Sequence, residues 1–291
     1  MAMEEKGIIL NGKALYSPKG AALEYARVGC NFYNGCPHDC QYCYLKRGVL
    51  SKALGKTDVT LKKCFADEND ALFTFKHEVE KHIDYLRKTG IFFSFTTDPM
   101  LRETHLLTLK AAKFALECDI PVKILTKCAN VPLSANLLIN DIDKEKRHLM
   151  AIGFTLTGRD DMEPHADPNA ERIDAMRRTK ALGYKTFASI EPIIDFESSF
   201  KMIQDAALVC DHFKIGLRSG VKADYYNPEE CAFFIGRVTG LCEKSNFTVY
   251  WKQSIHKYVQ KYMAKDNFEV ALSASSKFVD MDYNIFKEDS V

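Results

Sequence analysis

The sequence predicts an α/β fold built on a parallel sheet, either open or closed into a barrel. Segments typical of strands alternate with segments typical of helices along most of the chain. The 291 residues are 46% hydrophobic and 27% charged, which is ample for a large core. No repeat, low-complexity tract or linker rich in Pro or Ser divides the sequence. A single domain is therefore the simplest prediction.

Short apolar runs predict the strands in order. The first strand is expected at residues 25–32 and runs into a loop rich in cysteine. Six more strands are expected at residues 91–97, 122–127, 150–157, 185–190, 212–217 and 247–252. Helical patterns lie between them. In residues 104–118, apolar side chains at i, i+4, i+7 and i+11 form one helix face, namely Leu107, Ala111, Phe114 and Cys118.

Capping residues predict the ends of two further helices. Asp167 suits an N-cap and Pro168 the first helical position, while Gly183 closes the same helix. Asn227 and Pro228 open another helix by the same logic, and its acidic first turn suits the helix dipole.

Composition and charge narrow the cellular context. The net charge is +1, so no global field draws the chain to nucleic acid or to anionic membranes. The 10 cysteines in a chain of this length do not resemble a secreted disulfide framework, and they favour a reducing cytoplasm. The first six residues are too acidic for a signal peptide, and no segment is apolar enough to span a bilayer. We expect a cytoplasmic protein that does not enter membranes.

The most informative motif is a run of three cysteines, Cys36, Cys40 and Cys43, with the spacing Cys-x3-Cys-x-Tyr-Cys. Three thiolates in one loop can hold three irons of a four-iron cluster. The fourth iron then lacks a protein ligand, and an open coordination position is typical of catalytic metal sites. The alternatives are a zinc site, with His38 as fourth ligand, and a plain electron-transfer cluster. Cys-x3-Cys is unusual spacing for zinc.

Polar side chains follow the predicted strands at the points where the strands end. In parallel α/β folds the chemistry gathers at these carboxyl ends, and the cysteine loop follows the first strand on the same face. We therefore expect an active site there. The polar residues at the strand ends are Thr96, Thr97, Asp98, Thr126, Lys127, Cys128, Thr155, Thr157, Glu191, Arg218, Ser219, Lys252 and Gln253.

Cys-x3-Cys-x-aromatic-Cys in the loop after a first strand is the signature of radical S-adenosylmethionine (SAM) enzymes. The wider pattern resembles the branch of that family related to spore photoproduct lyase. The similar segments are residues 35–44, 96–99, 124–127, 171–172 and 188–192, and the resemblance covers residues 25–220. The cysteine motif is highly specific, whereas the other segments are short.

The resemblance implies a partial (β/α)6 radical SAM barrel with a short C-terminal extension. Residues 25–255 would form the barrel, residues 1–24 an N-terminal extension and residues 256–291 a C-terminal appendage. It also implies a 4Fe-4S cluster whose open iron binds S-adenosyl-L-methionine. Reductive cleavage of SAM would give a 5′-deoxyadenosyl radical that abstracts hydrogen from a substrate. The electron would come from an external donor of the flavodoxin or ferredoxin type.

The resemblance further implies residues that bind SAM. Tyr42 would lie near the adenine, Lys127 and Thr155 near the carboxylate or ribose, and Thr96 or Thr97 near the amino group. A sixth residue, Glu191, could orient the adenosine or the substrate, or could instead pair with a neighbouring arginine.

One position departs from the resembled lyase. There, a cysteine near the end of the second strand donates hydrogen to the product radical, and Phe95 occupies that position here. Cys128 is the only other cysteine at an expected edge of the active site. It is a candidate catalytic residue, and a structural role is the competing interpretation.

Features that bear on the substrate are open to two interpretations. Tyr225, Tyr226 and Trp251 could stack on a base or could simply pack. A basic stretch after the cysteine loop could follow a phosphate backbone or could be a solvated insertion. Its members are Lys46, Arg47, Lys52, Lys56, Lys62 and Lys63, with only Asp58 opposing them.

Two classes of function remain open at this stage. The first is a radical SAM enzyme acting on a damaged or modified base, a peptide or a small metabolite. The second is a non-catalytic iron–sulfur or zinc protein that serves as a carrier or scaffold. A carrier needs no pocket beside its cluster, so the polar strand ends, above all Thr96, Thr97, Asp98 and Lys127, distinguish the two. The sequence indicates no oligomeric state.

Overall fold

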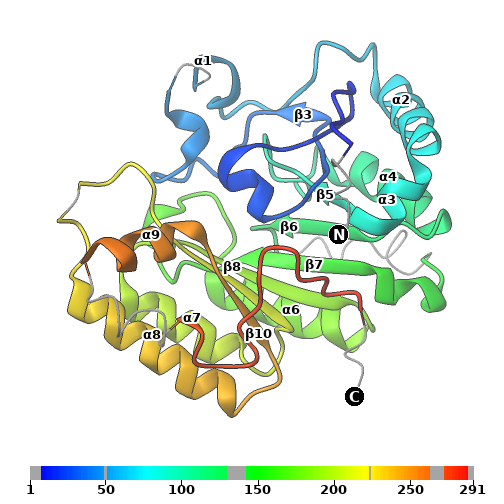
Figure 1. Ribbon diagram of the computed structural model, residues 1–291. Coiled ribbons are helices and arrows are strands. Elements are labelled where there is room, and N and C mark those ends of the chain that lie inside the picture. The colour runs from blue at the N-terminus through cyan, green and yellow to red at the C-terminus, as the bar shows by residue number, and fades with distance from the viewer. Residues whose placement is uncertain (1–7, 49–50, 130–141, 223, 263–271, 288–291) are drawn as a thin grey trace.

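The computed structural model describes residues 8–48, 51–129, 142–222, 224–262 and 272–287 (Figure 1). In this part of the chain an eight-stranded sheet has the order β1-β2-β5-β6-β7-β8-β9-β10. Only β1 pairs antiparallel, and all other neighbours are parallel. The two end strands, β1 and β10, do not pair with each other, so the sheet is not closed. The predicted α/β fold is confirmed, and its barrel is partial.

The sheet strands follow the predicted apolar runs with shifts at their ends. They are β1 Leu15–Tyr16, β2 Gly29–Cys30, β5 Ile91–Phe93, β6 Val122–Thr126, β7 Met150–Thr155, β8 Lys185–Ile193, β9 His212–Leu217 and β10 Thr248–Trp251. A separate antiparallel pair, β3 Tyr33–Asn34 and β4 Thr60–Leu61, flanks the cysteine loop.

The first predicted strand, residues 25–32, is largely wrong. Residues Gly20–Glu24 form a 3-10 helix, and the Tyr25 amide still bonds to the Ala22 carbonyl, so only Gly29–Cys30 joins the sheet. The strand at residues 91–97 also ends early, at Phe93. Beyond it the Ser94 hydroxyl bonds to the Thr97 carbonyl and the Thr96 hydroxyl to the Tyr33 carbonyl of β3.

Helices cover the outer face of the sheet. Figure 1 shows α2 (Glu68–Lys81), α3 (Ile83–Thr89) and α4 (His105–Glu117) gathered at one end, beside β5 and β6. At the other end lie α7 (Phe196–Ala206), α8 (Pro228–Glu243) and α9 (Gln253–Tyr262), with α6 (Asn169–Ala181) between the two groups. A short helix, α1 (Ser51–Leu54), follows the cysteine loop.

The predicted caps are confirmed in part. Asn227 caps α8, because its side-chain oxygen accepts hydrogen bonds from the backbone amides of Glu229 and Glu230. Asp167 does not cap α6, which begins one residue later than predicted, at Asn169. Instead, the Asp167 carboxylate accepts a hydrogen bond from the Ala129 amide at the end of β6. Gly183, with a φ of +88°, follows the end of α6 as expected.

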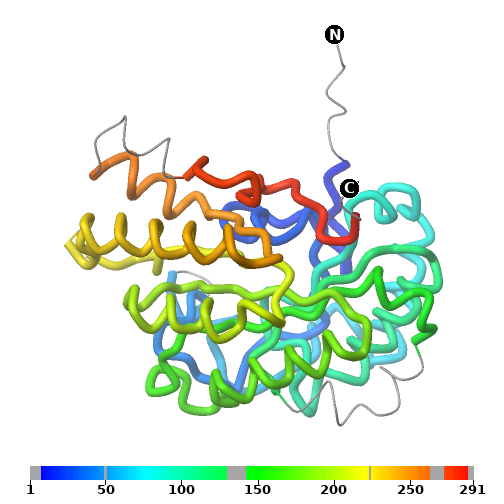
Figure 2. Tube along the Cα trace, turned by 90° about the horizontal axis from the view of Figure 1, so that it is seen from below, coloured from blue at the N-terminus to red at the C-terminus, as the bar shows by residue number. Residues whose placement is uncertain are grey.

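The inner face of the sheet has its own apolar cluster, which includes the C-terminal segment. Phe92, Ala151 and Phe187 from three strands pack with Ile285, and Phe286 lies against them. Figure 1 shows this segment, coloured red, crossing the sheet beside β7 and β10. In the tube view of Figure 2 the red segment runs along the top, away from the green helices at the bottom. The described C-terminal residues therefore fill one end of the partial barrel and leave the cysteine end to the polar residues.

Among the described residues, no helix combines the length and the apolar character needed to cross a membrane.

Candidate active site

The cysteine loop is held in place by backbone contacts around Gly35. This glycine has a φ of +86°, and a Cβ atom there would lie 2.0 Å from the Asp58 carbonyl oxygen. The Cys36 amide donates to the Lys56 carbonyl at 2.9 Å, which joins the loop to the chain that leads into β4. Only glycine fits both the conformation and the close approach.

The three cysteines of the loop are free thiols in distinct surroundings. Cys40 is buried against Tyr42, Met162 and Ile194, while Cys36 and Cys43 are partly exposed. Burial, together with the nearby Asp98 carboxylate, raises the pKa of the Cys36 thiol to about 12. The backbones of His38 and Asp98 act in the opposite direction and lower the pKa of this thiol. This second effect favours a thiolate, the form in which cysteine binds iron.

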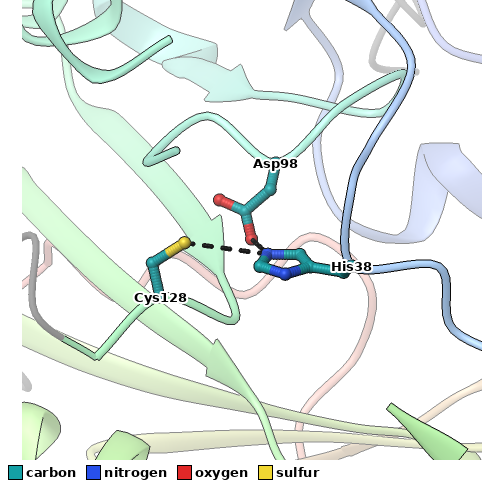
Figure 3. Close-up of side chains that lie close together, drawn as sticks. All are labelled: His38, Asp98 and Cys128. Atoms are coloured by element: carbon teal, nitrogen blue, oxygen red, sulfur yellow. Dashed lines mark hydrogen bonds and ion pairs between the residues drawn. The ribbon is translucent and has the colours of Figure 1, made fainter. Parts of the chain in front are cut away.

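Two buried polar groups, His38 in the cysteine loop and Asp98 beside it, form an ion pair (Figure 3). His38 Nε2 lies 3.0 Å from an Asp98 carboxylate oxygen, and His38 Nδ1 lies 3.0 Å from the His165 carbonyl. The carboxylate also accepts from the Thr126 hydroxyl and the Lys127 amide, both at 2.7 Å. Burial alone would raise the pKa of Asp98, but His38 and these donors lower it to about 2.

Because both ring nitrogens of His38 are engaged elsewhere, this histidine is not directed at the three cysteines as a zinc ligand. The His38 Nε2 atom that contacts Asp98 also has Cys128 beside it, with the Cys128 sulfur at 3.7 Å (Figure 3). The ligand atoms of His38, Asp98 and Cys128 lie within 4.8 Å of one another, a cluster separate from the cysteine triplet. The Cys128 side chain is buried, and burial raises the pKa of its thiol well above the ordinary range.

A second buried network fixes Tyr42. Its hydroxyl donates to the Glu163 carboxylate, whose other oxygen pairs with Arg172 Nη2 at 2.6 Å. Neither side chain of the Glu163–Arg172 pair is exposed to solvent. Arg172 also donates to the carbonyl of Thr155 at 2.8 Å and thereby ties the end of β7 to the network. Lys127 Nζ lies 3.9 Å from Glu163 and 5.4 Å from the Tyr42 ring centroid, beside the cysteine loop.

The two candidate threonines have different surroundings. Thr96 donates its hydroxyl to the Tyr33 carbonyl at 2.6 Å and so holds the loop after β5. Thr97 is buried, and its hydroxyl oxygen has no hydrogen-bond partner within the described part of the chain. A buried polar atom without a partner is costly, so this hydroxyl is available to hydrogen-bond with a bound ligand.

Glu191 belongs to a network on the far side of the site. Its carboxylate accepts from the Tyr25 hydroxyl at 2.7 Å and pairs with Lys252 Nζ at 2.5 Å. The Tyr25 hydroxyl also lies 2.6 Å from the Ser189 hydroxyl. Lys252 has a second carboxylate partner, Glu24, at 3.5 Å. The partner of Glu191 is therefore a lysine from the end of β10, and the predicted arginine is not the partner.

The structure gathers most of the predicted site residues at one edge of the sheet. Tyr42 lies in the cysteine loop, and Thr97 and Lys127 adjoin it. Thr155 ends β7, and Glu191 lies two residues before the end of the neighbouring strand β8. The basic stretch is partly engaged, because Lys46 pairs with Asp39, Arg47 bonds to the Ser219 carbonyl and Lys62 bonds to the Lys13 carbonyl. Trp251, at 2% exposure, lies in the core and presents no face to a base.

Sequence reasoning missed Glu163, Tyr25 and Glu24, which hold the candidate residues in place. Arg172 appeared in a motif but received no role. The available signal was local, since Glu163 and Arg172 lie nine residues apart just after a polar strand end.

The fold is similar to that of spore photoproduct lyase. A structure of that enzyme with dinucleoside spore photoproduct has a TM-score of 0.56 and 15% identity, over 91% of this chain and 79% of the lyase. A lyase variant with bound AdoMet and dinucleoside spore photoproduct has a TM-score of 0.59 and 15% identity, over 91% and 78%. At this identity the likeness establishes the fold alone, a partial barrel like that of the lyase.

In sequence, the chain is 27% identical over 202 residues to an uncharacterized protein of Methanocaldococcus jannaschii, covering 66% of this chain and 70% of that protein. No protein-family model matches the chain.

Proposed function

We propose that this protein is a radical SAM enzyme whose Cys36, Cys40 and Cys43 hold a 4Fe-4S cluster. When bound, the cluster supplies the electron that cleaves SAM to methionine and a 5′-deoxyadenosyl radical, which abstracts hydrogen from the substrate. An external donor of the flavodoxin or ferredoxin type would deliver that electron. The substrate is a separate question.

The observation that supports this proposal is the unpartnered hydroxyl of Thr97 beside the cysteine loop. A carrier that only transfers electrons has no use for an unsatisfied polar atom next to its cluster. An enzyme that binds the amino acid part of SAM there would satisfy it. Asp98, the next residue, contacts His38 of the cysteine loop at 3.0 Å, which puts this segment next to the loop.

The surrounding side chains fit the other parts of SAM. Lys127 offers an ammonium group to a carboxylate, and Tyr42 offers a ring held rigid by Glu163. We assign Thr155 and Glu191 to the adenosine side of the site, since they lie near the carboxyl ends of adjacent strands. Glu191 would act as a hydrogen-bond acceptor whose charge Lys252 already balances.

The scaffold or carrier alternative is weaker on two counts. A zinc site would need a fourth ligand, and both nitrogens of His38 are engaged with Asp98 and the His165 carbonyl. A fully ligated cluster would need a fourth thiolate. Cys128, the nearest additional candidate, has its sulfur against His38.

The proposal is tested by product analysis of reduced, cluster-loaded protein incubated with SAM under anaerobic conditions. We expect slow formation of 5′-deoxyadenosine and methionine even without substrate. S-adenosylhomocysteine without deoxyadenosine would indicate methyl transfer instead. If neither product appears while the cluster is fully loaded, the carrier function replaces the enzyme.

The two threonines provide matched variants for the same assay. Thr97→Val removes the unpartnered hydroxyl and should raise the KM for SAM about 10-fold or more, as expected for a lost hydrogen bond to a charged group. Thr96→Val removes a hydroxyl that bonds to the Tyr33 carbonyl and should leave the KM near wild type. Equal KM values for both variants would contradict the assignment of Thr97.

A further inference from the structure

A hollow of about 600 Å³ opens beyond the carboxyl end of β9, between the start of α8 and the end of α9. Four tyrosines and two carboxylates contribute to its lining. They are Tyr225, Tyr226, Tyr258, Tyr262, Asp224 and Glu230. Tyr225 and Tyr262 are 41% and 37% exposed, which is high for aromatic side chains in a hollow of the surface.

The tyrosine rings form a continuous row. Centroid distances are 4.8 Å between Tyr225 and Tyr226, 5.9 Å between Tyr226 and Tyr258, and 4.8 Å between Tyr258 and Tyr262. Hydroxyl hydrogen bonds within the protein hold Tyr225, Tyr226 and Tyr258. Tyr225 donates to the Ile194 carbonyl, Tyr226 to the Ile193 carbonyl and Tyr258 to the Tyr226 carbonyl. These bonds fix the rings, so the row offers aromatic surface more than hydroxyl groups.

The charged side chains that line the hollow are both acidic, which favours a cationic ligand. Asp224 and Glu230 are exposed at the hollow, and the face of an aromatic ring attracts ammonium and guanidinium groups. Within the chain, Lys261 Nζ already lies 4.8 Å from the Tyr262 ring centroid. A phosphodiester backbone would meet the two carboxylates unfavourably, although a base could stack on the rings.

The hollow is linked to the cysteine loop by one residue. The Ile194 carbonyl accepts a hydrogen bond from the Tyr225 hydroxyl at 3.1 Å, and the Ile194 side chain packs in the cluster that contains Cys40 and Tyr42. A group bound on the tyrosine row would therefore lie beside the proposed active site.

We propose that this tyrosine row binds a basic side chain, lysine or arginine, of a polypeptide substrate. The aromatic faces and the two carboxylates recognise the cation, and the openness of the hollow to solvent suits a side chain that projects from a larger molecule. The binding site stands on its own residues, and only its description as a substrate site rests on the proposed radical SAM function.

The test is isothermal titration calorimetry of the cluster-loaded protein with a capped octalysine peptide. We expect octalysine to bind, and Tyr225→Ala and Glu230→Gln each to weaken binding about 3- to 30-fold, the range of cation–aromatic contacts. Tyr225→Phe keeps the ring and should bind nearly as wild type. Glu80→Gln removes an exposed carboxylate on α2, at the opposite end of the molecule in Figure 1, and controls for non-specific attraction.

Three comparison ligands make the proposal refutable. Equal binding of an octapeptide of acetyl-lysine would show that charge is not recognised. Spermidine binding as tightly as octalysine would indicate a free polyamine site. Binding of single-stranded oligothymidylate that Tyr225→Ala removes and Glu230→Gln leaves intact would indicate base stacking. Octalysine binding that no variant at the row changes would overturn the proposal outright.

The binding assay does not depend on SAM cleavage, so failures of the two proposals are distinguishable. Absence of 5′-deoxyadenosine with intact octalysine binding would remove the radical SAM function and leave the cation site. Normal deoxyadenosine formation without octalysine binding would remove only the cation site.

Discussion

The buried pair of Glu163 and Arg172 is expected to be a major contributor to stability at the site. Both side chains are fully buried, and Glu163 also accepts the Tyr42 hydroxyl. Glu163→Gln keeps the shape of the side chain but leaves the Arg172 guanidinium without its carboxylate. Removing one partner of a buried pair costs about 3–5 kcal/mol. Because Arg172 keeps its bonds to the carbonyls of Thr155 and Asp167, we expect a loss near 3 kcal/mol in the free energy of unfolding.

Equilibrium urea unfolding, followed by the fluorescence of the single tryptophan, Trp251, measures this loss. Asp174→Asn is the matched control. Asp174 lies on α6, as Arg172 does, and pairs with Arg177 and Arg178, but its side chain is 49% exposed. Such surface pairs contribute about 0.2–1 kcal/mol. A loss below about 1 kcal/mol for Glu163→Gln, with an unchanged slope, would refute the reasoning.

Three further predictions concern the loop, the barrel interior and the substrate. Gly35→Ala should destabilise the protein and lower its iron content by more than Gly20→Ala. Both glycines have positive φ, but only at Gly35 would the new Cβ atom clash with a carbonyl oxygen. Equal iron content in the two variants would contradict this. Burial lowers the pKa of Lys123 from 10.5 to about 8, so its protonation opposes folding below pH 8 and stops doing so as pH approaches 10.5. Lys123→Met should therefore be more stable than wild type at pH 7, with the difference in unfolding free energy shrinking by pH 10; a constant difference would exclude the effect. Phe95, whose ring stacks on Phe92 at a centroid distance of 4.6 Å, has no weak S–H bond from which to donate a hydrogen atom. Reduced protein should therefore not repair dinucleotide spore photoproduct efficiently. Multiple-turnover formation of thymine monomers would refute this, and loss of that activity in Cys128→Ala would identify Cys128 as the donor.

The strands were predictable where an apolar run alone decides the structure. Residues 150–155 form β7 within the predicted segment, and all six of these residues are buried. The first strand was not predictable in the same way. Its first half comes directly after a 3-10 helix. The Glu24 carboxylate pairs with Lys252, and the Tyr25 ring contacts the same lysine, which lies more than 220 residues away in the sequence. Tertiary contacts of this kind leave no local pattern.

In the candidate active site, too, the local sequence pattern was predictable and the tertiary contacts were not. The spacing of Cys36, Cys40 and Cys43 is local and could be read directly. The neighbours of these cysteines come from distant segments. Asp98 meets His38 across 60 residues, and Glu191 meets Lys252 across 61. Sequence could name Asp98 and Lys252 as polar strand ends, but the partner of each depends on strand order and register, which only the fold determines.

Whether the open iron binds SAM is the central question, and electron paramagnetic resonance of the reduced, cluster-loaded protein addresses it most directly. One iron of the cluster has no cysteine ligand. If SAM binds to that iron, its set of ligands changes, and the spectrum should shift when SAM is added. The triple variant with Ala at Cys36, Cys40 and Cys43 should show no cluster signal, whereas Ala at Cys64 and Cys118 should leave it unchanged. Superimposable spectra with and without SAM, in protein that carries about four iron and four sulfide per chain, would contradict the account.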